Sequence, residues 1–526
     1  MTTIPLSIDL WLINQRWSYP TEVCTCATKL IRSSLAIWQF MRTLLGELGL
    51  EESTLTDVMS SVFQFEVKIA EIVAPNSERQ NILQIYNKVT VSELQAMSPQ
   101  FDWLSILRSL ASPHAIDAND ELLVYSIEYI KSLSTLIENS DPKVVHNFML
   151  WHLAASFVQV TNSRMKEAYV KLYNTVTGAR TGQEQWKDCA NIVSNKFSMA
   201  VGALFVREAF GPEGKREVSE IVAHIKTAFK ESIRYNGWMS EETRQVAIEK
   251  ANAMDGKIGY PDYILDPEEL DKEFEEVEVD QSNFLQSMVN QARFSLRKSI
   301  GKLSKPHDKD EWRAPPQIMN ALYRPSTNSM VMLAAILQRP IFDSENLKAL
   351  NYAGIGFVVA HELTHGFDTH GRLYNQDGNI APWWSEESTR KFEERTRCVV
   401  DQYSEYEVEG TGMKINGNMT KAENIADLGA IKHAFNAYRT QVMESGEEEE
   451  LPGLEKTNDQ TFFLAYAQNW CTNRRTESSK LQLITDSHSP AAYRVIGTLS
   501  QFDEFSRAFS CNVGSNMNPE QKCSVF

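Results

Sequence analysis

The sequence has few cysteines, no long apolar run and fewer basic than acidic residues. Its 526 residues contain 52 Lys and Arg against 69 Asp and Glu, a formal net charge of −17. Nucleic-acid binders usually carry a basic surface, so we expect no nucleic-acid partner. The apolar runs fall short of the ~20 residues that cross a bilayer. We therefore expect no transmembrane segment in this chain. The first 17 residues, interrupted by Asp9 and without a basic start, argue against a secretory signal.

Cysteine is scarce, and none of the spacings is typical of a metal site. The seven are Cys24, Cys26, Cys189, Cys398, Cys471, Cys511 and Cys523. They fit either buried thiols of a cytosolic protein or part of a disulfide framework in an exported one. Because the number is odd, at least one cysteine has no partner within the chain.

What is present indicates a large globular protein. The residues are 42% hydrophobic, 10% aromatic and 23% charged, close to globular averages. This length predicts two to four core-sized units. We find no internal repeat.

Apolar residues at steps of three and four predict helices over the first half of the chain. One stripe runs from Val58 to Ile72, and another includes Ile221, Ile225 and Phe229. After about residue 260 the pattern becomes mixed, and residues 329–333 read as a buried strand. We expect a mainly α (α+β) protein with a helical lobe, residues 1–260, and a mixed, helix-rich lobe, residues 261–526.

The segment His361-Glu362-Leu363-Thr364-His365 is an H-E-x-x-H pattern that follows an apolar stretch. On a helix the two histidines share one face, where their nitrogens can bind Zn²⁺ at ~2.0–2.1 Å. Glu362 is then close enough to accept a proton from a water molecule at the metal. The alternative is two structural histidines that happen to be four residues apart.

A zinc site needs a further protein ligand, and residues 423–427 (ENIAD) offer two acids four residues apart. On a helix Glu423 could bind the metal while Asp427 accepts a hydrogen bond from a ligand histidine. The alternative is a solvated acidic face, which is common at this spacing. The H-E-x-x-H pattern upstream makes Glu423 the leading candidate.

Several motifs occur in the order found in one enzyme family. They are NALY (320–323), HELTHGFDTHGR (361–372), ENIAD (423–427), SHSPAAYR (487–494) and a terminal Cys-x-x-aromatic (523–526). On these motifs the chain resembles the neprilysin and endothelin-converting-enzyme family of zinc metalloendopeptidases from about Asn87 to Phe526. The resemblance implies a two-lobed gluzincin-type fold, with a thermolysin-like catalytic lobe and a helical lobe that restricts access to the active site.

The resemblance also implies roles for individual residues. Zinc ligands would be His361, His365 and Glu423, with Glu362 as the general base. Asp427 and Asp368 would orient the two histidines, and His488 would stabilise the oxyanion. The expected substrate-binding residues are Asn320, Ala321, Arg494, Phe357, Val358 and Trp470, the last three around an apolar pocket for the residue after the scissile bond.

The family pattern has a short cytosolic tail, a membrane helix and more extracellular sequence ahead of the matching region. We therefore expect the chain to be truncated at its N-terminus relative to that pattern, and the complete protein to be membrane-anchored or secreted. The resemblance pairs Cys398 with Cys523. It leaves the partners of Cys189, Cys471 and Cys511 in the preceding portion.

Three functions remain open. The first is a zinc endopeptidase that cleaves short peptides on the amino side of hydrophobic residues. The second is a weak or inactive peptide-binding member of the same family. The third is another H-E-x-x-H enzyme such as an aminopeptidase, although the chain contains no G-x-M-E-N segment.

Overall fold

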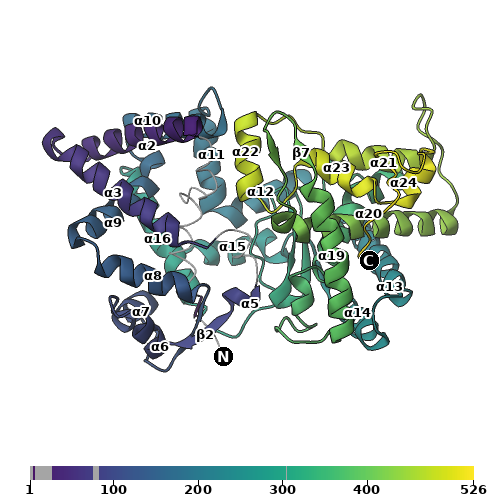
Figure 1. The fold of residues 1–526 in the computed structure, drawn as a ribbon, viewed down its shortest axis with the longest axis horizontal. Coiled ribbons are helices and arrows are strands. Elements are labelled where there is room, and N and C mark those ends of the chain that lie inside the picture. Colours follow the sequence, from purple (N-terminus) through teal and green to yellow (C-terminus); the bar gives the residue numbers. More distant parts are fainter. Residues whose placement is uncertain (1–3, 6–26, 75–81, 304) are drawn as a thin grey trace. The chain divides into compact units, whose positions relative to one another are not determined.

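The computed structural model describes residues 4–5, 27–74, 82–303 and 305–526. They form two compact units, each built from three segments of the chain (Figure 1). Unit 1 comprises residues 1–185, 274–310 and 475–485, and unit 2 comprises 186–273, 311–474 and 486–526. Cys24 and Cys26 lie outside the described residues.

This division differs from the single boundary expected near residue 260. Residues 186–273 belong to unit 2, because strand β4 (Asp255–Gly259) pairs in parallel with β6 (Ser329–Leu333). Helix α13 (Pro212–Arg234) also packs on α20 (Gly417–Ser445). Helical periodicity predicts these elements but cannot show with which partners they pack.

The described residues of unit 1 are mainly helical and include two apolar cores. One core joins α2, α3, α9 and α10 through residues such as Phe40, Met59 and Trp151. The other joins a small sheet, ordered β1-β3-β2, to its neighbouring helices. The elements are β1 (Ile4–Pro5), α2 (Ala27–Glu47), α3 (Glu52–Ile72), α5 (Ile82–Ile85), β2 (Asn87–Thr90), α6 (Val91–Met97), α7 (Trp103–Ala111), β3 (Glu121–Val124), α8 (Ile127–Glu138), α9 (Pro142–Ser156), η2 (Val158–Val160), α10 (Ser163–Thr177), α16 (Phe284–Ile300) and α22 (Thr476–Thr485).

Unit 2 is built around α18 (Phe357–His365) and the long helix α20, which pack directly against each other. The other elements, apart from β4, β6 and α13 given above, are α11 (Gln185–Lys196), α12 (Ser198–Ala209), α14 (Glu241–Ala253), η3 (Asp262–Leu265), α15 (Pro267–Phe274), β5 (Ala321–Arg324), η4 (Pro325–Thr327), α17 (Lys348–Asn351), η5 (Tyr352–Gly356), η6 (Gly371–Leu373), α19 (Glu386–Ser404), β7 (Glu407–Val408), β8 (Met413–Lys414), α21 (Asn458–Asn469), α23 (Ala491–Leu499) and α24 (Asp503–Ala508). The mainly helical fold class with few strands is confirmed.

Most local expectations hold. The stripe on α13 is buried, with Ile225 and Phe229 fully inaccessible, and Pro212 at its first turn suits a helix start. The strand expected at 329–333 is β6, and all five of its residues are buried. It lies between β4 and β5, so β5 is an edge strand of the sheet.

Among the described helices, no single one has the length and apolarity needed to span a membrane. Two short helices, α11 and α12, satisfy length and composition together but meet at 105°.

The expected disulfide between Cys398 and Cys523 is present and joins positions 125 residues apart. The residues that follow Cys523 are held by side chains of unit 2. Trp238 Nε1 donates to the carbonyl of Val525 (2.8 Å), and Lys432 Nζ donates to Phe526 O (2.9 Å). Cys189, Cys471 and Cys511 form no disulfide within the described residues.

Candidate functional site

The H-E-x-x-H pattern lies on α18, which continues a buried π-helical turn, η5. The turn brings the backbone close to a neighbouring loop. The N–H of Ile355 donates to the carbonyl of Ile341 at 2.9 Å, and a Cβ on Gly354 would overlap that carbonyl oxygen. Glycine is therefore required at position 354, where the neighbouring loop approaches the turn before α18.

The two histidines meet on one face of α18, as their spacing predicts. His361 Nε2 and His365 Nε2 are 3.0 Å apart. Each ring has a carboxylate at its other nitrogen. Nδ1 of His365 lies 2.7 Å from Asp368, and Nδ1 of His361 lies 2.8 Å from Asp427. These carboxylates favour a proton on each Nδ1 and leave both Nε2 lone pairs facing each other.

Helix α20 brings Glu423 to the same point. Its Oε2 lies 3.2 Å from His361 Nε2 and 3.3 Å from His365 Nε2. Donor atoms of these three residues all lie within 4.8 Å of one another. Residues 58 positions apart meet because α18 and α20 pack along their lengths.

This arrangement fits Zn²⁺. Ligand atoms of a tetrahedral zinc, each ~2.0–2.1 Å from the ion, lie roughly 3.3 Å apart. The spacings between the two Nε2 atoms and Oε2 are close to that value. Among the described residues, Oε2 of Glu423 is buried without a conventional hydrogen bond. Two imidazole lone pairs that face each other repel unless a cation or proton lies between them. A bound cation satisfies all three atoms.

Both orienting carboxylates are themselves held. Asp368 accepts the backbone N–H groups of His370 and Gly371, each at 2.7 Å. Asp427 is fully buried and forms a bidentate pair with Arg494. Although burial favours the neutral acid, the Arg494 charge and hydrogen bonds keep the pKa of Asp427 below its ordinary value.

Glu362 points from the same helix and is 7% exposed. Burial raises the pKa of its carboxyl above the ordinary value, although the neighbouring histidines oppose this shift. Raising the pKa makes the carboxylate a stronger base.

His488, from the loop before α23, also reaches Glu423. Its Nε2 lies 3.2 Å from Oε2 of Glu423, and its Nδ1 lies 2.8 Å from Asp486. Burial disfavours the charged ring, but the Asp486 and Glu423 carboxylates outweigh it and raise the pKa of His488 to about 9. Sequence reasoning did not single out Asp486. A carboxylate two residues before a candidate catalytic histidine could have indicated it.

The six expected substrate-binding residues occupy two places in unit 2. Asn320 is exposed and immediately precedes the edge strand β5, which begins with Ala321. The rings of Phe357 and Trp470 lie 6.2 Å apart, with Val358 half-buried beside Phe357 on α18. Arg494 does not stand free, because its guanidinium contacts Asp427 and lies 4.0 Å from the centre of the Trp470 ring.

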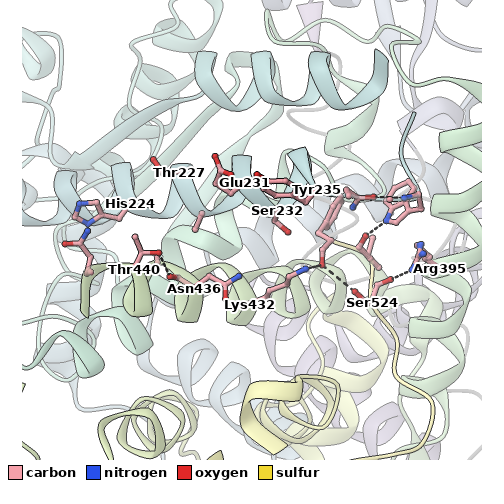
Figure 2. A pocket seen from close by; sticks show the side chains of 18 of the residues that line it. His224, Thr227, Glu231, Ser232, Tyr235, Arg395, Lys432, Asn436, Thr440 and Ser524 are labelled. Atoms are coloured by element: carbon pink, nitrogen blue, oxygen red, sulfur yellow. Dashed lines mark hydrogen bonds between the residues drawn. The ribbon is translucent and has the colours of Figure 1, made fainter. Parts of the chain in front are cut away.

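A separate cavity of about 780 Å³ lies along α13 and α20 (Figure 2). Its walls include His224, Glu231, Lys432 and the last three residues of the chain. None of the candidate zinc ligands lines it, so this cavity is distinct from the metal site.

Comparison with known proteins agrees with this geometry. Two profiles of peptidase family M13 match the chain, one over residues 28–261 and one over residues 320–525. The chain belongs to peptidase family M13. The resemblance noted from the motifs is therefore confirmed.

The M13 relatives include endothelin-converting enzyme 1 of Mus musculus, 41% identical over 485 residues, which is 92% of this chain and 63% of that protein. Neprilysin-11 of Caenorhabditis elegans is 38% identical. The alignment covers 91% of this chain and 57% of that protein. The chain therefore spans less than two thirds of these relatives. Among solved structures, the zinc metalloprotease Zmp1 of Mycobacterium tuberculosis aligns with a TM-score of 0.86 at 28% identity. The alignment covers 94% of this chain and 75% of the Zmp1 chain.

Proposed function

We propose that this M13 protein is a zinc-dependent endopeptidase that hydrolyses short peptides. The observation that carries the proposal is the convergence of His361 Nε2, His365 Nε2 and Glu423 Oε2, with Glu362 on the turn between the two histidines. Membership of the family and the structural similarity to Zmp1, a zinc metalloprotease, support it.

His361, His365 and Glu423 would hold the metal. When bound, zinc supplies a Lewis acid that acidifies water and polarises a carbonyl oxygen. Glu362 would take the proton from the attacking water and return it to the leaving amine. Burial raises the pKa of this carboxyl, which makes the carboxylate a stronger base for the first step.

His488 would stabilise the oxyanion that forms on the substrate carbonyl. Its Nε2 faces Glu423, one of the candidate ligands, and Asp486 at Nδ1 fixes the ring and favours its protonated form. A donor held in advance where negative charge develops is a large contributor to peptide hydrolysis.

The edge strand β5 would bind the peptide backbone. Its neighbour in the sheet is β6, so its other side can pair with an extended chain. Asn320 precedes this strand and is exposed, which leaves its amide able to contact substrate.

The rings near α18 favour hydrophobic side chains after the scissile bond. Phe357 packs against Tyr466, with ring centres 4.6 Å apart, and Trp470 completes the group. Arg494, which contacts both Trp470 and Asp427, would orient this wall and reach a substrate carbonyl.

We further propose that the protein acts outside the cytoplasm, at the cell surface or after secretion. The Cys398–Cys523 disulfide supports this location, because such bonds persist in oxidising compartments.

The test combines metal content with cleavage of an internally quenched peptide whose two ends are blocked. The proposal expects about one zinc per chain and cleavage that stops with 1,10-phenanthroline and returns with added zinc. A peptide series that varies only the residue after the scissile bond should favour Phe and Leu over Asp and Gly. Zinc binding without cleavage would instead identify a peptide-binding member, and cleavage only of peptides with a free amino terminus would identify an aminopeptidase.

A further inference from the structure

Lys250, near the end of α14, is a buried cation that the proposed chemistry does not use. It is 1% exposed. Burial lowers the pKa of its ammonium group to about 7, with the charge of Asp368 acting in the opposite direction. Burying a lysine is unfavourable unless its hydrogens find acceptors, so its contacts call for an explanation.

The contacts are three backbone carbonyls on one short segment. Lys250 Nζ donates to the carbonyl oxygens of Gly366, Gly371 and Tyr374, each at 2.7 Å. These groups flank the turn that follows α18. An ammonium has three hydrogens and no acceptor, so the three carbonyls match its full capacity.

This segment carries Asp368, the partner of His365. The segment bends so tightly that Asp368 Oδ1 accepts two N–H groups of the same turn while Oδ2 contacts His365 Nδ1. A Cβ at Gly371 would overlap the carbonyl oxygen of His365, so the turn closes directly onto the metal-binding helix. The position of this turn therefore sets the position of the carboxylate relative to the ring.

The same lysine also contacts the β5–β6 hairpin, which contains the edge strand. Its own carbonyl accepts from Asn328 Nδ2 at 3.1 Å, and Asn328 Oδ1 accepts from the hydroxyl of Tyr323 in β5 at 3.0 Å. Asn328 lies at the hairpin tip with φ 47°, in the left-handed region. Lys250 is thus bonded to both the turn bearing Asp368 and the β5–β6 hairpin.

We propose that Lys250 is a positioning residue of the metal site, which holds the turn of residues 366–374 so that Asp368 orients His365. Within the described residues its ammonium donates to the carbonyls of this turn and not to a candidate zinc ligand, so it acts through the turn. The inference rests on the zinc site of the proposed function. Carboxylates behind metal-binding histidines typically contribute 10–100-fold to metal affinity, so losing their support should be measurable.

The test is the zinc affinity of the full chain, measured by competition with a chromophoric chelator. Lys250→Met keeps the length of the side chain and removes the three donors, and we expect zinc affinity to fall about 10-fold or more. Lys226→Met is the matched control. Lys226 Nζ also donates to backbone carbonyls, those of Asn252 (3.2 Å) and Met254 (2.9 Å), but not to the turn bearing Asp368. Its zinc affinity should stay within about twofold of the parent protein.

A double-mutant cycle with Asp368→Asn separates positioning from general destabilisation. If Lys250 acts through Asp368, the zinc affinity of the double variant should be about the same as that of the single variant with the lower zinc affinity. Losses that multiply, or an unchanged affinity in Lys250→Met, would overturn the inference.

If Lys250→Met does not fold, Lys250→Arg replaces it, because the guanidinium retains the charge and several donors. Its planar geometry cannot reproduce the three-carbonyl contact, so we expect a several-fold loss that is again not additive with Asp368→Asn. Parental affinity or additivity in this variant would reject the proposal. Zinc affinity is measured without substrate. The outcome for Lys250 can therefore be told apart from the outcome of the peptidase assay.

Discussion

Arg494 donates two hydrogen bonds to Asp427, from Nε to Oδ2 at 2.7 Å and from Nη2 to Oδ1 at 2.6 Å. Asp427 in turn lies 2.8 Å from Nδ1 of His361. The three residues form a buried chain from α23 through α20 to α18. The arginine therefore supports a candidate zinc ligand through one carboxylate, in addition to any contact with substrate.

Replacing this arginine should destabilise the protein. Arg494→Met leaves Asp427 as a buried carboxylate without its cation, and breaking such a pair typically costs about 3–5 kcal/mol. Urea denaturation of the zinc-loaded protein measures the loss. Arg439→Met is the control, because Arg439 pairs with the partly exposed Glu447 and Asp459 and should contribute less than about 1 kcal/mol. Equal losses in the two variants would contradict this account.

Glu362→Gln should separate metal binding from turnover. The amide keeps the size of the side chain but cannot accept the proton from water, and general base catalysis contributes about 10²–10⁴-fold. We expect parental zinc content and near-complete loss of cleavage of the quenched peptide. Chelator-sensitive cleavage at the parental rate would exclude Glu362 as the base.

Asp486→Asn tests the partner of His488 that sequence reasoning missed. An amide stabilises a protonated ring at Nδ1 less than a carboxylate does, so the donor that we propose for the oxyanion should be weakened and misplaced. We expect kcat to fall roughly tenfold or more with KM little changed, because the interaction matters chiefly in the transition state. A rise in KM of about tenfold with unchanged kcat would show that the residue serves substrate binding instead.

The convergence of the candidate metal ligands could be predicted because its key signals are local. His361 and His365 lie four residues apart on one helix, and so do Glu423 and Asp427 on another, so each pair shares a face whatever the rest of the fold does. The strand at 329–333 and the stripe on α13 were likewise visible in local hydrophobicity.

Other features depend on long-range packing that no local pattern encodes. Lys250 binds carbonyls 116, 121 and 124 residues away, and any residue type can supply a carbonyl. The unit boundaries depend on the parallel pairing of β4 with β6, which brings residues 186–273 into unit 2. The π-helical turn η5 contains Ile355, whose N–H donates to the carbonyl of Ile341 outside the helix.

Removing the disulfide should cost substantial stability. The bond closes a loop of 125 residues, for which the loop-entropy relation gives about 5 kcal/mol. The double variant Cys398→Ser/Cys523→Ser, which leaves no single thiol, should show this loss in urea denaturation. Cys471→Ser, at an exposed cysteine outside any disulfide within the described residues, should change the free energy of unfolding by less than about 0.5 kcal/mol.

His433, on α20, should make the fold sensitive to acid. It is fully buried against Phe229, and within the described residues neither ring nitrogen has a hydrogen-bond partner. Burial, with a smaller contribution from the charge of Lys432, lowers the pKa of His433 to about 3. The unfolded chain, with a histidine pKa of about 6.5, therefore binds more protons between these values, and stability falls as pH decreases through that range.

His433→Leu removes this proton linkage and places an apolar side chain of similar size in the same buried position. At pH 5.5, one unit below the unfolded pKa, the parent protein loses about 1.4 kcal/mol that the variant retains. The difference in unfolding free energy between variant and parent should thus shift by about that amount in favour of the variant from pH 7.5 to 5.5. Comparing the two proteins at each pH cancels acid effects that they share, including weaker zinc binding by protonated ligands. A difference that does not change with pH would show that the ring is protonated, or hydrated, in the folded protein.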